Sequence, residues 1–124
     1  MIEFLHPPEP GSPRPFSRVA KAAGLVFVSG HSAPHDPARG IHRGTTAAEE
    51  TRNALHHIAS LLAEAGSSLE RVVQVTMLIT DRADYVECNA EYVRHFPQGL
   101  PARHTALFGV PTDARVGFAA IALA

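Results

Sequence analysis

The 124-residue chain has one cysteine, no tryptophan and no long apolar run. The lone Cys88 cannot form an internal disulfide. No apolar stretch approaches the roughly 20 residues that span a bilayer, which argues against a membrane role. The N-terminus also lacks a basic segment leading into an apolar run, so we expect no signal peptide and a soluble, cytoplasmic protein.

The sequence has little charge of either sign. Charged residues make up 19% of the chain, and the formal net charge is −1. No basic stripe with interleaved aromatic residues is present, so we expect no nucleic-acid partner and no attraction to an anionic membrane. The length and the 45% apolar content predict one domain spanning residues 1–124.

Proline is concentrated at the N-terminus, where residues 1–17 hold five of the ten prolines. Because proline has no N–H to donate, this segment cannot supply a regular ladder of backbone donors, and we expect an extended arm held by another element. Residues 18–30 contain two short apolar runs around Gly24, which favour a hairpin. Residues 31–44 predict a loop.

The first helix is predicted from Thr46. Glu49 follows three residues later in a capping-box pattern, and apolar residues recur at helical spacing up to residue 65. Gly66 then supplies the stop. Residues 71–80 are β-branched and apolar, as expected of a central strand.

A second helix is predicted within residues 81–97. Asp81 or Asp84 would cap it and Pro97 would end it. Its expected apolar stripe is Tyr85, Cys88, Tyr92 and Phe96.

Two further strands, at about 104–108 and 115–123, complete the order ββαβαββ. Two helices can then pack on one face of a single sheet, which gives an α+β two-layer sandwich. Along residues 116–123 both alternating sets of side chains are apolar, so the second face needs a cover. We expect a homo-oligomer that packs sheet faces together; the alternative is that the proline-rich arm folds over that face.

In order and spacing, several segments resemble the RidA/YjgF family of reactive-intermediate deaminases. They are "GLVFVSGHSAP" at 24–34, "TRNALHHIASLLAEAG" at 51–66, "VVQVTMLITDRADYVECNAEY" at 72–92, "LPARHTAL" at 100–107 and "ARVGFAAIALA" at 114–124. The resemblance implies a chorismate-mutase-like sandwich with a mixed sheet, assembled as a homotrimer with sites between subunits. It also implies cofactor-free hydrolysis of enamines and imines to 2-oxo acids and ammonia.

Arg103 is the first candidate site residue. Its guanidinium is always charged and offers the planar fork of donors that holds a carboxylate, such as that of an imino acid. The alternative role is an ion pair across a subunit boundary. The matching family positions nearby are Gly30, which lets a ligand approach the backbone, and Asn89; Thr105 shares the strand face of Arg103 and can bond to a ligand or water.

Two positions depart from the family pattern, and a glycine lies beside one of them. Ala119 stands where the family's deaminases carry a glutamate that positions or activates water, Gly117 lies on the same face, and Phe16 stands where they usually have a tyrosine. These changes predict a pocket that is more apolar, and wider at Ala119 and Gly117. Loss of a general base costs typically 10²- to 10⁴-fold in rate.

Histidine is the candidate replacement for the missing acid. His31 follows Gly30 directly and could act as a base, although a loop or interface role is the plainer alternative. His104 is expected on the opposite strand face from Arg103. The histidines of the 31–44 loop match no defensible metal pattern, so no metal site is predicted, and the adjacent His56 and His57 are expected on the surface or at an interface.

The resulting hypothesis is a trimeric imine or enamine hydrolase in which Arg103 anchors the substrate carboxylate. Two alternatives stay open: a trimer that binds a carboxylate metabolite without chemistry, and a deaminase dedicated to one bulkier pathway intermediate. A ribonuclease ranks last because the chain lacks a basic surface.

Overall fold

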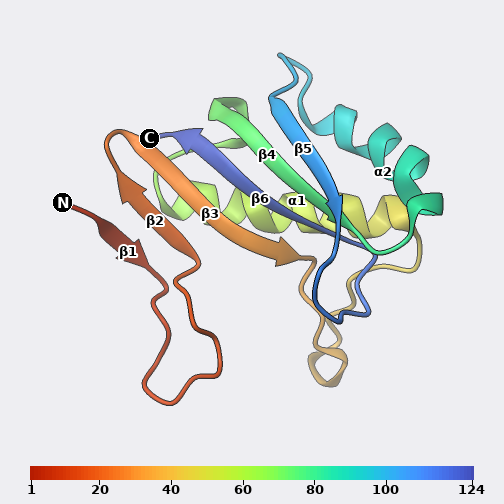
Figure 1. Ribbon diagram of the computed structural model, residues 1–124, viewed down its shortest axis with the longest axis horizontal. Coiled ribbons are helices and arrows are strands. Elements are labelled where there is room, and N and C mark those ends of the chain that lie inside the picture. The colour runs from red at the N-terminus through yellow and green to blue at the C-terminus, as the bar shows by residue number, and fades with distance from the viewer.

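The computed structural model describes all of residues 1–124 and shows one sheet with two helices on one of its faces (Figure 1). The helices are α1 (Ala47–Glu64) and α2 (Tyr85–Tyr92). The strands are β1 (Glu3–Leu5), β2 (Val19–Ala22), β3 (Leu25–Ser32), β4 (Val72–Ile79), β5 (Ala102–Leu107) and β6 (Val116–Leu123).

The strand order is β1-β2-β3-β6-β4-β5. β4 and β5 are parallel and all other neighbouring pairs are antiparallel, so the sheet is mixed. The predicted α+β two-layer sandwich is therefore confirmed, with one additional strand at the N-terminus.

The prediction that the arm forms no regular ladder of backbone hydrogen bonds is wrong for β1, which lies within the arm. Glu3 pairs with Lys21 and Leu5 with Val19 along β2. These residues precede Pro7, so their backbone donors are intact. The arm does not fold over the bare face of the sheet; β1 lengthens the sheet at its β2 edge, and the proline-rich part loops away from the strands (Figure 1).

Helix α1 begins and ends where the sequence predicts. The Thr46 hydroxyl accepts a hydrogen bond from the Glu49 N–H at 3.1 Å. The Glu49 carboxylate accepts from the N–H and the hydroxyl of Thr45, one residue before the position expected in a capping box. After the helix, Gly66 adopts a φ of 84°, a left-handed conformation that glycine permits at little cost.

Helix α2 differs in detail from its prediction. Asp81 caps a 3₁₀ turn that leads into the helix, accepting a hydrogen bond from the Ala83 N–H, whereas the Asp84 side chain makes no cap bond. Cys88, Tyr92 and Phe96 are buried as the stripe predicts. Tyr85 is 41% exposed and does not belong to the core.

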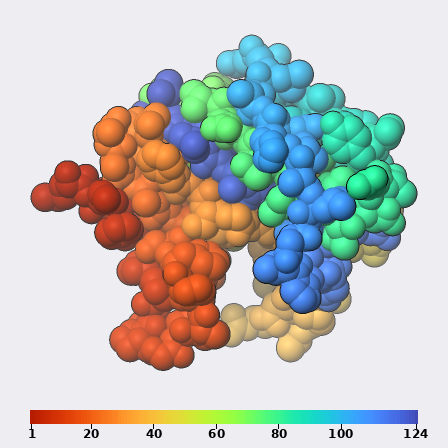
Figure 2. Space-filling model, viewed as in Figure 1, coloured from red at the N-terminus to blue at the C-terminus, as the bar shows by residue number.

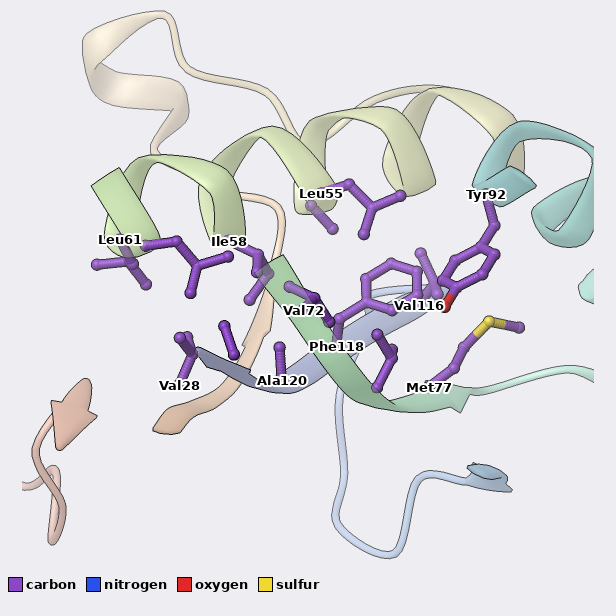
Figure 3. Packing of buried hydrophobic residues seen from close by; sticks show 14 of the residues in the cluster. Val28, Leu55, Ile58, Leu61, Val72, Met77, Tyr92, Val116, Phe118 and Ala120 are labelled. Carbon is purple, nitrogen blue, oxygen red and sulfur yellow. The ribbon is translucent and has the colours of Figure 1, made fainter. Parts of the chain in front are cut away.

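The core lies between α1 and the sheet. Alternate residues of β3, β4 and β6 face the helices. Figure 3 shows Val28, Phe118 and Ala120 on the side of the sheet that faces α1, and Met77 beneath Tyr92. Tyr92 joins this core from α2, with its ring stacked 5.9 Å from that of Phe118. This packing fixes which face of each strand is covered.

The opposite face of the sheet has no covering layer. Figure 2 views the molecule from this side, where β3, β6 and β4 lie side by side at the surface. The register directs Phe27, Ile121 and Leu123 outward on this face, and Phe27 and Leu123 are 39% and 46% exposed. The sequence-based expectation of an apolar second face is correct for this chain.

Candidate functional site

Arg103 lies on the edge strand β5, on the face covered by the helices. It pairs with Val75, a core residue, and its guanidinium carbon lies 4.7 Å from the ring centroid of Tyr92 and 5.8 Å from that of Tyr85. The Nη2 group donates a hydrogen bond to the Tyr85 hydroxyl at 3.3 Å. The two aromatic faces hold the cation by cation–π attraction.

No carboxylate of the chain pairs with Arg103. Every ion pair within the chain involves other residues, and the guanidinium is only half-buried between the tyrosines. A partly desolvated cation of this kind has unused N–H donors in a planar fork. A carboxylate from outside the chain fits that arrangement.

Two polar atoms on the side of α2 that carries Tyr85 and Tyr92 also lack partners. Tyr85, Asn89 and Tyr92 recur on one side of α2, so Asn89 lies between the two tyrosines that contact the guanidinium. The Asn89 Oδ1 and the Tyr92 hydroxyl are buried without a hydrogen bond. Burial raises the pKa of Tyr92, although the nearby Arg103 opposes this.

Thr105 extends this first group of residues along β5. It pairs with Met77, as Arg103 pairs with Val75, so both side chains lie on the helix-covered face. His104 pairs with Thr76 and lies on the opposite face, as alternation predicts. Arg103 and Thr105 therefore lie on the sheet face that the helices cover, and Arg103 meets the side of α2 that carries Asn89. We call Arg103, Thr105 and Asn89 the anchoring group.

A β-bulge in β3 positions the second group. Val28 pairs with Ala120 and His31 with Phe118, so two residues, Ser29 and Gly30, lie opposite the single residue between those partners. The bulge turns His31 to the helix-covered face, with its ring 5.0 Å from that of His57 on α1. Gly30, His31 and Phe16 line one open cavity of about 450 Å³.

His31 is held in a neutral form with one free nitrogen. Its Nδ1 lies 2.7 Å from the Ser29 carbonyl oxygen; since a carbonyl can only accept, Nδ1 carries the proton and Nε2 is left as an acceptor. Burial, followed by His57 and then Arg18 and Arg14, lowers the pKa of His31 to about 4. Burial and Arg18 also lower the pKa of His57, against an opposing effect of Glu64.

Ala119 lies apart from both of these groups, on the bare face of the central strand β6. It pairs with Thr76, which in turn pairs with His104, so these three residues form a row across the sheet. Ala119 is half-exposed. No acidic side chain belongs to this row.

The predicted widening at Gly117 is wrong. A Cβ at this position would lie 3.1 Å from Cζ of Phe108 and 3.2 Å from Oγ of Ser32. The space that a side chain would occupy is thus filled by the Phe108 ring, which follows β5. A smaller cavity of about 210 Å³ lies beside it, lined partly by Leu78 and Val110.

The structure does not bring the predicted site residues together within one chain. β3 and β5 are separated by β6 and β4, which is three strand spacings or about 14 Å. Within a single chain Ala119 and Arg103 face opposite sides of the sheet, so position 119 cannot act beside Arg103 of the same chain. Only a neighbouring copy could unite them.

Comparison with known proteins decides the family. Residues 7–123 match the family described as Endoribonuclease L-PSP. The chain belongs to this family. The protein is 36% identical to protein mmf2, mitochondrial, of Schizosaccharomyces pombe, over 83% of this chain and 80% of that relative. It is 35% identical to 3-aminoacrylate deaminase RutC of Acinetobacter baylyi, over 87% and 86% of the two chains.

Solved structures agree with this L-PSP assignment. A member of the YjgF protein family from Neisseria meningitidis superposes with a TM-score of 0.80 at 29% identity, covering 99% of this chain and 94% of that one. The resemblance to the RidA/YjgF family is therefore confirmed. Neither helix of this L-PSP family member has both the length and the apolar character that a membrane span requires.

Four residues that lie near Arg103 or His31 were not predicted from the sequence to belong to the site. Tyr85 and Tyr92 were assigned to the core stripe, and their position four before and three after Asn89 was the available signal for a shared face. His57 was expected at the surface or an interface but lies half-buried against His31. Arg18 directly precedes β2, and its carbonyl accepts a hydrogen bond from the Ser29 N–H of β3. Its proximity to His31 therefore depends on the register of this pair and on the bulge, which no local pattern predicts.

The lowered pKa of His31 predicts a stability change with pH. The ordinary value is 6.5, so between about pH 4 and 6.5 the unfolded chain binds a proton that the folded chain excludes. The free energy of unfolding should fall as the pH drops through this window and should not change from this source above it. Urea unfolding at a series of pH values should show a shallower dependence for His31→Gln, whereas His42→Gln, at an exposed loop position, should follow the parent. An unchanged slope in His31→Gln would contradict the burial of a neutral imidazole.

Proposed function

We propose that this protein hydrolyses reactive enamines and imines that carry a carboxylate, releasing the 2-oxo acid and ammonia. The observation that carries the proposal is the unpaired guanidinium of Arg103, held between two tyrosines beside the unpartnered Oδ1 of Asn89. A relative of this chain is named 3-aminoacrylate deaminase, an enzyme for a small enamine that bears a carboxylate. No cofactor is needed for such a hydrolysis, since water is the only co-reactant.

The proposed assembly is a homotrimer of one-domain subunits, located in the cytoplasm. The bare apolar face of the sheet supports an oligomer, because Phe27 and Leu123 are 39% and 46% exposed in the single chain. The separation of the anchoring group from the β3 cavity also supports it. A site between subunits would combine Arg103, Thr105 and Asn89 of one copy with Phe16, Gly30 and Ala119 of its neighbour.

In the proposed reaction Arg103 holds the substrate carboxylate by two parallel hydrogen bonds and so places the adjacent C=N carbon. An enamine first takes up a proton at carbon to become the iminium ion, and an imine reaches the same ion by protonation at nitrogen. Water then adds to the C=N carbon and loses one proton to a base, which gives the neutral carbinolamine. The protonated base returns that proton to nitrogen, and the C–N bond breaks to release ammonia while the hydroxyl gives its proton to solvent as C=O forms. The Thr105 hydroxyl would orient the water, and the free Nε2 of His31 is the candidate base.

Light scattering tests the assembly. The chain mass is 13.3 kDa, and size-exclusion chromatography should give three times that mass, because burial of three apolar sheet faces offsets the entropy of association. Phe27→Asp should shift the protein toward the single chain. A parent protein that elutes with the mass of one chain would contradict the trimer.

Replacing Arg103 tests the anchor. Arg103→Gln should lower kcat/KM for imine hydrolysis by roughly 100-fold, as expected for the loss of two charge-assisted hydrogen bonds. The measurement couples an amino-acid oxidase to the protein and follows imine decay over a panel of amino acids. Arg94→Gln, a change at a 76% exposed side chain, is the matched control and should behave as the parent. If the parent accelerates the decay of no imine, the hydrolase proposal fails.

A second function is favoured by one observation, the absence of any acid in the row of Ala119, Thr76 and His104. A trimer that binds a carboxylate metabolite without turning it over needs the anchor but no base. The alternative of a bulkier dedicated substrate now has only Ala119 as support, because Phe108 occupies the space above Gly117. Ribonuclease activity is not proposed, since the net charge is −1.

Restoring the acid separates the two functions. Ala119→Glu should raise the rate of imine hydrolysis by about 10²- to 10⁴-fold if the site lacks only its general base. Ala119→Gln matches its size without the acid and should give no such gain. If Ala119→Glu binds a carboxylate ligand as the parent does and shows no gain in oxidase-coupled assays, the binding function is the correct one.

A further inference from the structure

The cavity at the end of β3 collects positive charge. Its walls include Arg14 from the arm, Arg18 directly before β2, His31 from β3 and His57 from α1. We call these four residues the basic pocket. The cavity has a volume of about 450 Å³ and opens to solvent, so it is large enough for a small-molecule group.

The two arginines of the basic pocket differ in their contacts. The Nη1 group of Arg14 donates hydrogen bonds to the carbonyls of His6 and Phe16, and its guanidinium lies 5.7 Å from the Phe16 ring centroid. Arg14 is thereby fixed in place. Arg18 forms no ion pair with any residue of the chain, and its charge is felt by both His31 and His57.

The chain supplies no free acid to neutralise this charge. Asp36 is the one carboxylate among the lining residues, and it pairs with Arg39 at 3.4 Å. Glu64 acts on His57 from α1 but pairs with His6 of the arm. His35, the remaining titratable group at the cavity, accepts a hydrogen bond from the Arg43 N–H. An anion from outside would therefore meet an uncompensated cation at Arg18.

We propose that the basic pocket receives an acidic group of the ligand, so that the preferred substrate is an imino acid with a second acidic group in its side chain. This inference rests on the proposed function, in which a neighbour's Arg103 takes the carboxylate beside the reacting carbon. Arg103 and Arg18 then bind the two ends of one dianion. A neutral side chain leaves Arg18 without a partner, which is the physical basis of the selectivity.

Inorganic sulfate tests the pocket without catalysis, because its charge is constant between about pH 5 and 8. Titration calorimetry on the intact assembly should show binding that Arg18→Gln weakens about tenfold, the loss of one charge-assisted contact. Binding should tighten as the pH falls, since the anion favours protonation of His31 and His57, whose pKa values are lowered by burial and, further, by Arg18. Arg52→Gln, at an exposed position on α1, is the matched control and should bind sulfate as the parent does.

The substrate claim is tested with oxidase-generated imines of glutamate and leucine. The ratio of kcat/KM for the acidic over the neutral imine should exceed one in the parent and fall about tenfold in Arg18→Gln, while Arg52→Gln keeps the parent ratio. Sulfate binding that depends on Arg18, together with a ratio near one, would show a pocket for a free anion and overturn the substrate claim.

Two further outcomes separate this inference from the proposed function. If no imine is hydrolysed, the hydrolase proposal fails, and succinate against butyrate binding then tests the pocket alone; equal affinity for the two would overturn it. If the assembly binds neither sulfate nor succinate, an acid of the neighbouring copy pairs with Arg18 and the inference is wrong.

Discussion

The rest of this structure depends on one constraint: only two helices, α1 and α2, are available to cover a six-stranded sheet. α1 and α2 bury one face of the central strands through a continuous apolar layer centred on Phe118, and no chain is left to cover the other face. Side chains alternate between the two faces along a strand. The packing of the helices on one face therefore decides which residues of β5 and β6 are covered and which lie on the bare face. Arg103 lies on the face that the helices cover, and Ala119 lies on the bare face.

That division explains why the candidate site is split. The cation of Arg103 lies against two tyrosine rings of α2, on the side of that helix that also carries Asn89. The bulge at Ser29 and Gly30 turns His31 toward α1. Each half is preorganised by its own helix. In the proposed trimer, contacts through the bare face would bring the edge strand β5 of one copy to the end of β3 in another copy.

Charge distribution matters more here than net charge. The chain has a formal charge of −1, yet several of its arginines form no ion pair. Among these, Arg103 lies against aromatic rings and Arg18 lines a cavity. Holding an unpaired cation where water is partly excluded is costly unless a ligand supplies the counter-charge. Opposite charges elsewhere in the chain, such as Glu50 with Arg115, are paired inside the fold.

The sequence by itself determined the secondary-structure elements and the family. Local signals, such as the Thr46 cap, the Gly66 stop and the β-branched run of β4, depend on contacts a few residues apart, and they predicted the layers correctly. Tertiary structure alone decided that Phe108 fills the space over Gly117, that Arg18 and His57 approach His31, and that Arg103 and Ala119 face apart. These outcomes depend on sheet register, on a bulge and on the path of the arm, which join residues distant in the chain and leave no local pattern.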